Sequence, residues 1–256
     1  LKVKKNCMAI NTITIMQAMT NNIVDIHSHL IYGVDDGAKT LEDSIKTLEL
    51  LEKLEIRKVI CTPHICHGET DHIIKIKENY LKIRELAKQK NIELYLGTEI
   101  LITSETTQLL LRKRLRSLNG SKYVLVEFKR SEHMEEEKAI SLLEDIIDIG
   151  FKPILAHPEL YVNYRNIKFI KKLKEIGVLL QLDASSILKN KTKLKIYNYS
   201  KKLLKHHYID IVASDNHSNK NRNYNVLPQA YKYISKKYGK EYTELLFCIN
   251  PKEVLD

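Results

Sequence analysis

The fold is decided by residues 23–64, IVDIHSHLIYGVDDGAKTLEDSIKTLELLEKLEIRKVICTPH, which read as a strand, a helix and a second strand. The outer runs, 23–27 and 58–62, are short and rich in β-branched residues, as buried strands are. Between them, apolar residues recur at helical spacing from Leu41 to Leu54, directly after a capping sequence formed by Thr40 and Asp43. This order predicts two parallel strands joined by a helix.

The same alternation continues along the chain. Seven strands that alternate with helices predict an α/β fold with a parallel sheet and outer helices, either open or closed into a barrel. Because no repeat or low-complexity linker interrupts the pattern, we expect one domain over residues 23–256 after a poorly ordered extension, 1–22. The further strands are expected at 93–97, 123–128, 153–156, 178–182 and 209–214, and the further helices at 71–90, 105–116, 135–149, 166–176, 194–206 and 226–238.

The composition fits a globular protein, with 43% hydrophobic and 29% charged residues among 256. The net charge of +10 favours anionic partners, but the lysines are spread over many helices. No basic stripe is interleaved with aromatic residues, so we expect no nucleic-acid partner. Four cysteines form no C-x-x-C pair, and no segment has the about 20 apolar residues of a membrane span. We therefore expect a soluble, cytoplasmic protein.

Histidines and carboxylates gather at the ends of the predicted strands. Six of the seven strands deliver such a residue at or just beyond their carboxyl ends, where the loops of parallel α/β proteins converge to form active sites. Imidazole and carboxylate without thiolate suit zinc, manganese or iron. The sequence predicts a site for more than one ion, built from His27, His29, His64, Glu99, Glu127, His157, Asp215 and His217.

Within VDIHSH, strand alternation makes a further prediction. Asp25, His27 and His29 are expected on one face, with Val24 and Ile26 on the other. Asp25 is then expected to hold one ligand imidazole in its required tautomer. The other five histidines are expected at the surface, outside the site; they are His67, His72, His133, His206 and His207.

The ordered motifs DIHSH, GVDDGAKT, CTPH, GTEI, VEF, PILAHPE, QLDASS and ASDNH resemble those of the polymerase and histidinol phosphatase (PHP) superfamily. GVDDGAKT and AHPE are similar to its bacterial manganese-dependent tyrosine-protein phosphatases of capsule and exopolysaccharide synthesis. The resemblance spans residues 23–230. It implies a distorted, TIM-like barrel of seven strand–helix units, with the metal site at the carboxyl ends of the strands.

The resemblance also implies three divalent metal ions, with Mn²⁺ expected first and Zn²⁺, Fe²⁺ or Co²⁺ as alternatives. Chemistry alone does not choose between Asp35 and Asp36 as a ligand, whereas the family pattern places it at Asp36. The implied ligands are His27, His29, Glu99 and Asp215 for the first ion, Glu99, Glu127 and His157 for the second, and Asp36, His64 and His217 for the third.

The implied reaction is hydrolysis of phosphotyrosine on a protein by a hydroxide that bridges the metals. The implied substrate is the tail of a membrane-associated tyrosine autokinase, close to the membrane surface. Arg222 is expected to bind the phosphate and, with Asp215 and His217, forms the predicted catalytic group. Leu160 stands where the family usually has a second phosphate-binding arginine, so Arg165 or a lysine is expected to substitute.

Other functions compete with this interpretation. A cysteine mechanism is excluded, because no cysteine is followed six residues later by arginine. A small-molecule phosphatase such as a histidinol-phosphatase would share all the metals, and the GVDDGAK loop and the chain length favour the protein phosphatase over it. A nuclease fits the charge but lacks the basic stripe. A non-catalytic regulator that keeps the metals as structure stays open because of Leu160.

Overall fold

The computed structural model describes residues 22–65, 69–131, 134–161, 165–217 and 224–256. The expected extension therefore falls almost wholly outside the described residues, as do Arg222, His67 and His133. The strands are Val24–Ser28 (β1), Lys58–Cys61 (β2), His64–Ile65 (β3), Glu93–Leu96 (β4), Glu99–Leu101 (β5), Tyr123–Glu127 (β6), Lys152–Ala156 (β7), Leu179–Asp183 (β8) and Ile211–Ala213 (β9).

Helices follow the strands, as the sequence predicts. The predicted helices match the structure to within one residue, except that 105–116 forms a helix only over its first half. No helix in the described part of the chain is both long and apolar enough to cross a membrane. The helices are Leu41–Leu54 (α2), Thr70–Gln89 (α3), Thr106–Leu111 (α4), Glu136–Asp148 (α5), Ile167–Glu175 (α6), Leu194–Lys205 (α7), Val226–Tyr238 (α8), Lys240–Glu244 (α9) and Asn250–Glu253 (α10). Short 3-10 helices lie at Leu118–Gly120 (η1), Pro158–Leu160 (η2), Ala184–Ile187 (η4) and Lys191–Lys193 (η5), and a π-helix at Leu245–Ile249 (η6).

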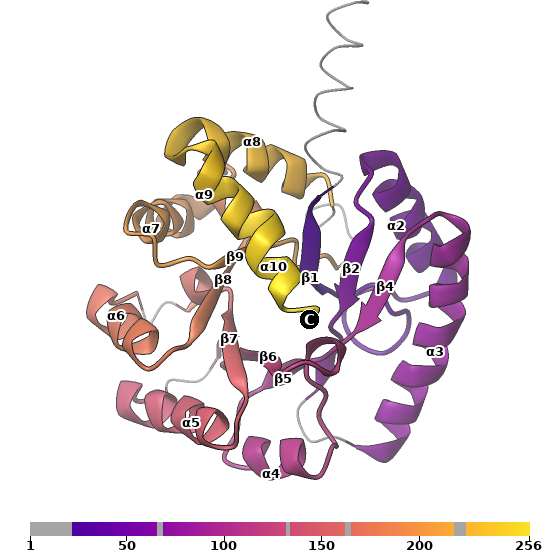
Figure 1. Cartoon of the computed structure of the whole chain (residues 1–256), viewed down its shortest axis with the longest axis horizontal. Helices are drawn as coiled ribbons and strands as arrows, with labels where there is room; N and C mark the ends of the chain where they lie inside the picture. The colour runs from indigo at the N-terminus through magenta and orange to yellow at the C-terminus, as the bar shows by residue number, and fades with distance from the viewer. Residues whose placement is uncertain (1–21, 66–68, 132–133, 162–164, 218–223) are drawn as a thin grey trace, which may run out of the picture.

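All the strand pairs are parallel, in two sheets with the orders β1-β2-β4 and β3-β5-β6-β7-β8-β9. The two sheets are continuous with each other, because β3 follows β2 and β5 follows β4 after short breaks. At these breaks the Gly97 N–H donates to the Cys61 carbonyl (2.9 Å). On the other side, the His29 N–H after β1 donates to the Asn216 carbonyl after β9 (2.8 Å). The strands thus circle as a distorted barrel with the helices outside (Figure 1).

Two apolar layers hold the barrel together. The larger lies between the strands and the outer helices, and α2 begins in the predicted capping box, with the Thr40 hydroxyl accepting from the Asp43 N–H. The smaller fills the barrel and includes Ile26, Ile154 and Val254. Figure 1 shows α10 crossing one end of the barrel, and Asn250 in that helix donates to the carbonyl of Asp210, just before β9. The C-terminal segment thus covers the amino ends of the strands.

A bulge in β1 changes which side chains share a face. The register with β2 shifts after Asp25, so that three residues of β1 span two of β2. Ile26 lies in the barrel interior, yet the next residue, His27, also directs its imidazole toward the site. The Asp25 carboxylate instead accepts from the N–H and the hydroxyl of Ser214 (2.8 and 2.6 Å). The prediction that Asp25 shares the face of the two histidines and orients a ligand is wrong, because strand alternation breaks at the bulge.

Candidate metal centre

The predicted ligands meet at the carboxyl ends of the strands. β1 ends between the two histidines of its H-x-H sequence, β3 and β5 begin at ligand residues, and β6 ends at one. Close groups of ligand atoms, each within 4.8 Å of one another, comprise His29, Asp36, His64 and His217; His27, Glu99 and His157; His27, His29 and Asp215; and His64, Glu99 and Glu127.

The ligands expected for the first ion surround His27, in β1, and His29, just after it. Nε2 of His27 lies 2.9 Å from Glu99 Oε2 and 3.5 Å from Asp215 Oδ1. Nε2 of His29 lies 3.1 and 3.5 Å from the same two oxygens. The two Nε2 atoms are 3.2 Å apart. The four residues expected for the first ion therefore point at a common position.

Two neighbours fix the tautomers of these imidazoles. Nδ1 of His27 donates to Gln181 Oε1 (2.8 Å), and Nδ1 of His29 donates to Asp35 Oδ2 (2.7 Å). A neutral ring with its proton on Nδ1 presents a lone pair from Nε2. Two such lone pairs then face each other beside the carboxylate oxygen of Glu99, which is a set of electron donors suited to a cation.

Asp36 approaches His64 and His217, the histidines expected at the third ion, from the solvent side. Its Oδ1 lies 3.3 Å from Nε2 of both His64 and His217, although its side chain is 68% exposed. Hydrogen bonds with these two histidines hold the pKa of Asp36 well below its usual range. The preceding Asp35 turns to His29 instead. The two aspartates thus have different neighbours, and Asp36 lies beside His64 and His217, the histidines with which the resemblance groups it.

Glu99 lies between the groups. Its Oε1 is 2.9 Å from Nε2 of His157, while its Oε2 faces His27 and His29 and lies 3.1 Å from Nδ1 of His64. Glu127 contacts the same region, with Oε1 3.2 Å from His64 Nδ1 and Oε2 3.7 Å from His157 Nε2. Each oxygen of Glu99 therefore addresses a different set of nitrogens, which is the arrangement that a bridging ligand requires.

The electrostatics of the centre favour a cation. Burial alone would raise the pKa of Glu99, but the charge of His27 and hydrogen bonds with His157, His27 and His29 hold that pKa well below its usual range. Burial alone would lower the pKa of His29, but hydrogen bonds with Asp215, Asp35 and Glu99 raise it well above its usual range. Glu99 Oε2 is buried and faces the Nε2 atoms of His27 and His29 at 2.9 and 3.1 Å. These residues fit divalent metal ions, which would supply the positive charge that imidazolium protons otherwise provide.

Two of the predicted ligand positions have strained backbones. His157 has a φ of 37° and Asp215 a φ of 47°, in the left-handed region that side chains other than glycine rarely adopt. Such conformations cost on the order of 1–3 kcal/mol each and persist where the surrounding structure enforces them. Both residues directly follow the carboxyl end of a strand or its short extension, where the chain must turn sharply to direct the side chain into the centre.

Sequence reasoning missed two residues of the centre. Gln181 comes from β8, the one predicted strand that ends without a predicted ligand, and its amide also donates to Asp183 (3.1 Å). A polar residue inside the apolar run VLLQL was the available signal. Arg130 follows β6, and its guanidinium lies 3.4 Å from His157 Nε2 and 3.9 Å from Glu127 Oε2. Its position three residues beyond a strand-end ligand was a weaker signal.

Arg165 and the described histidines expected outside the site lie outside the predicted ligand groups. Arg165 donates from Nε to the backbone carbonyl of Glu159 (3.3 Å). His206 and His207 are exposed, as expected. His72 is only partly exposed, because α3 brings its Nε2 within 3.3 Å of the His64 carbonyl oxygen. His72 thus lies in a partly exposed position on α3 and belongs to none of the ligand groups.

The described thiols are poor nucleophiles. Burial raises the pKa of Cys61 well above its usual range and that of Cys248 to about 11. Both side chains are therefore protonated near neutral pH, and the thiolate is the reactive form. This agrees with the absence of a C-x5-R motif.

A family model for capsular polysaccharide synthesis, CpsB/CapC, matches residues 23–256. The chain belongs to this family. Among its CpsB/CapC relatives, the tyrosine-protein phosphatase CpsB of Streptococcus pneumoniae is 34% identical over 242 residues, covering 91% of this chain and 98% of that protein. The tyrosine-protein phosphatase YwqE of Bacillus subtilis is 32% identical over 234 residues, covering 88% of each.

Solved structures agree with the fold and with this family. A crystal structure from work on YwqE and S. pneumoniae CpsB, described as unique metal-dependent tyrosine phosphatases, superposes with a TM-score of 0.79 at 29% identity, covering 91% of this chain and 94% of that one. The phosphotriesterase homology protein of Escherichia coli superposes with a TM-score of 0.61 at 12% identity, covering 93% and 99%, which supports the barrel fold alone. The resemblance and the α/β fold class drawn from the sequence are confirmed.

Proposed function

We propose that this CpsB/CapC chain is a metal-dependent phosphatase that hydrolyses phosphotyrosine on proteins in capsule or exopolysaccharide synthesis. The observation that carries the proposal is the convergence of imidazole and carboxylate atoms on the two oxygens of Glu99 at the carboxyl ends of the strands. The tyrosine-phosphatase names of the relatives support the substrate class. The substrate protein that we expect is the phosphorylated tail of a tyrosine autokinase, in the cytoplasm.

The centre would hold three divalent ions, with Mn²⁺ as the first candidate. When bound, such ions lower the pKa of a coordinated water, polarise the phosphoryl oxygens and stabilise the leaving phenolate. The ligands in this proposal are His27, His29, Glu99 and Asp215 for the first ion, Glu99, Glu127 and His157 for the second, and Asp36, His64 and His217 for the third.

The other residues of the chain prepare the centre. Gln181 and Asp35 hold the protons of two imidazoles on Nδ1, so that each Nε2 faces inward. The bulge in β1 and the left-handed backbones of His157 and Asp215 direct side chains inward that regular strands would direct elsewhere. Asp215 and His217 belong to the proposed catalytic group through the metals, and Arg222 through the phosphate.

We assign Arg130 to phosphate binding. It would take the role of the family arginine whose position is occupied by Leu160 in this chain. Its side chain is 39% exposed and lies against His157 and Glu127, with the nearer carboxylate oxygen of Glu127 at 3.9 Å. It therefore lies beside the proposed second ion without a tight ion pair to Glu127. A guanidinium in this position can donate two hydrogen bonds to a phosphoryl group.

Replacing Arg130 with glutamine is expected to lower kcat/KM for a phosphotyrosyl peptide about 10- to 100-fold, the equivalent of one or two charge-assisted hydrogen bonds. Arg130→Lys should recover part of the loss, because it restores the charge without the fork geometry. Steady-state kinetics at saturating Mn²⁺ measure the effect, and exposed Arg112→Gln provides the matched control. Wild-type kcat/KM in Arg130→Gln would remove the residue from the site.

The proposed function is tested by metal removal. Treatment with a chelator should abolish phosphate release from a phosphotyrosyl peptide, and added Mn²⁺ should restore it. His27→Ala and Asp215→Ala should stay inactive under the same conditions. Activity that survives chelation or either substitution contradicts the metallophosphatase. Faster hydrolysis of histidinol phosphate than of the peptide favours the small-molecule phosphatase, and bound metal without hydrolysis of any ester favours the non-catalytic regulator.

A further inference from the structure

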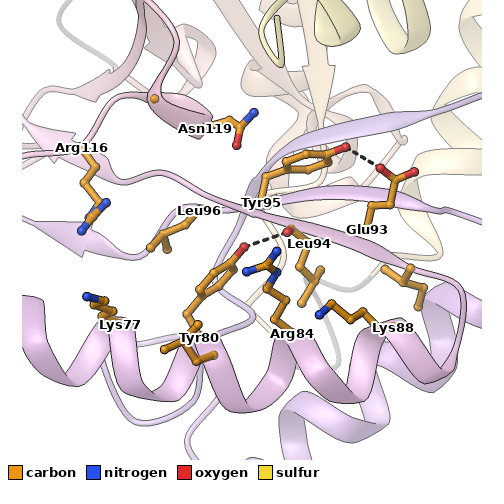
Figure 2. A pocket seen from close by; sticks show the side chains of 13 residues that line it. Lys77, Tyr80, Arg84, Lys88, Glu93, Leu94, Tyr95, Leu96, Arg116 and Asn119 are labelled. Atoms are coloured by element: carbon orange, nitrogen blue, oxygen red, sulfur yellow. Dashed lines mark hydrogen bonds between the residues drawn. The ribbon is translucent and has the colours of Figure 1, made fainter.

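A groove of about 590 Å³ runs beside β4 on the outside of the barrel. Figure 2 shows α3 along one side of this groove, with β4 and the segment that carries Arg116 and Asn119 along the other. This basic groove is separate from the proposed metal ligands, none of which lines it. Its end at Leu96 is nevertheless only three residues, about 10 Å of extended chain, from Glu99.

Four of the 13 residues that line the groove are basic. Lys77, Arg84 and Lys88 are spaced seven and four residues apart on α3, which places them on one face of the helix, and Arg116 lies across from Lys77 (Figure 2). Lys88 forms an ion pair with Glu85 at 2.7 Å. The other three cations have no carboxylate within 4 Å among the described residues. Their charge is therefore available to an anionic ligand.

Glu93 alone is acidic among the described residues that line the groove, and its Oε2 accepts from the Tyr95 hydroxyl (2.7 Å) while Lys58 lies 3.8 Å from its Oε1. Asp256 lies close enough to Tyr95 to help raise the pKa of that hydroxyl. Leu81 lies between the cations of α3 with 45% of its surface exposed. The groove thus combines positive charge with an apolar contact, which suits a peptide better than a free inorganic anion.

The shape of the groove follows from a gap in the barrel wall. β4 pairs with β2 on one edge and with no described strand on the other. Helix α4, which was expected to run to residue 116, ends at Leu111, and Lys113 follows with a left-handed φ of 55°. The segment after it forms turns and the short 3-10 helix η1, which packs against β4, and no longer helix of the described residues follows before β6.

The free edge of β4 is itself partly blocked. The Tyr80 hydroxyl from α3 donates to the Leu94 carbonyl (2.7 Å), an acceptor that an added strand would use (Figure 2). An occupant cannot pair along the whole edge, so recognition depends on the cations that border it. The stretch of α3 from Lys77 to Lys88 spans about 17 Å, the length of about five extended residues.

We propose that the basic groove is a docking site for an acidic, extended segment of the phosphoprotein substrate. The assignment of that segment to the substrate rests on the proposed phosphatase function, whereas binding of an acidic peptide does not. A concave groove between a helix and a strand suits a single chain and not the flat surface of an anionic membrane. Docking here would raise the local concentration of a flexible substrate near the metal centre.

The test uses the full chain and a fluorescein-labelled hexaglutamate peptide, with a hexaglutamine peptide as the probe control. A variant carrying Lys77→Gln, Arg84→Gln and Arg116→Gln should bind hexaglutamate at least tenfold more weakly than the unmodified chain, by fluorescence anisotropy. The matched control, Lys202→Gln with Lys232→Gln and Lys236→Gln, removes the same charge from exposed positions of α7 and α8 and should bind as the unmodified chain does. Glutamine is a good helix former, and circular dichroism verifies the fold.

The kinetic arm compares two phosphotyrosyl peptides, one with an acidic tract and one with a neutral tract. The groove variant should raise KM at least fivefold for the acidic peptide alone and leave hydrolysis of p-nitrophenyl phosphate unchanged. If the groove variant and the matched control bind hexaglutamate equally tightly, the groove is not the binding site for the acidic peptide. If the unmodified chain binds phosphatidylserine vesicles but not hexaglutamate, and the groove variant loses the vesicle binding, the surface binds a membrane and not a peptide. Because anisotropy is measured without turnover, a chain that hydrolyses nothing but binds hexaglutamate contradicts the proposed function and not the groove.

Discussion

Glu99→Gln is expected to lower kcat/KM for a phosphotyrosyl peptide by about 10³-fold or more and to reduce the metal content of the purified protein. Glutamine keeps the size of the side chain but provides one neutral oxygen where two charged oxygens each face a different set of imidazoles. Loss of a bridging ligand removes charge stabilisation worth several kcal/mol in the transition state, and each 1.4 kcal/mol corresponds to a factor of ten.

The measurement pairs steady-state kinetics with metal analysis of the same protein by mass spectrometry. Glu144→Gln makes the same chemical change at an exposed position of α5 and should retain activity and metal. Circular dichroism should show that Glu99→Gln keeps its helices, since the change is isosteric. A Glu99→Gln protein with its full metal content and activity within tenfold of the unmodified chain would show that Glu99 does not bridge the ions.

Most of the proposed ligands could be inferred from the sequence because they lie at or just beyond the ends of predicted strands. His64 and His157, for example, follow short apolar runs, and parallel strands bring such ends together in any α/β arrangement. The choice of Asp36 over Asp35 required more than chemistry. The structure supplies the physical reason, because the turn directs one carboxylate to His64 and His217 and the other to His29.

The residues that support the ligands could not be predicted in the same way. Asp25 was expected to orient an imidazole, but the bulge in β1 turns it to Ser214, and Gln181 from a strand more than 150 residues away takes the role. Bulges and cross-strand partners depend on register between distant segments, which periodicity within one strand does not encode. The short α4 has a similar cause, because the left-handed Lys113 ends a pattern that continues in the sequence.

Gly37→Ala is expected to reduce activity about 100-fold and to lower the free energy of unfolding by about 1–3 kcal/mol. A β-carbon at Gly37 would lie 2.3 Å from both the Cβ and the carbonyl oxygen of His29, and 3.0 Å from Asp35 Oδ1. Neither atom of His29 can rotate away, so the turn that carries Asp35 and Asp36 must move. The tautomer contact of His29 and the position of Asp36 would then both be lost.

Gly33→Ala in the same turn distinguishes the effect of backbone strain from the effect of moving the turn away from His29. Gly33 has a φ of 67°, so alanine is strained there, but its β-carbon would meet nothing nearer than the Lys39 carbonyl at 3.6 Å. It should lower the melting temperature while leaving activity and metal content within a few-fold of the unmodified chain. Thermal unfolding, kinetics and metal analysis of both variants decide the matter. If Gly33→Ala loses as much activity as Gly37→Ala, then activity depends on the stability of the turn and not on the close approach of Gly37 to His29.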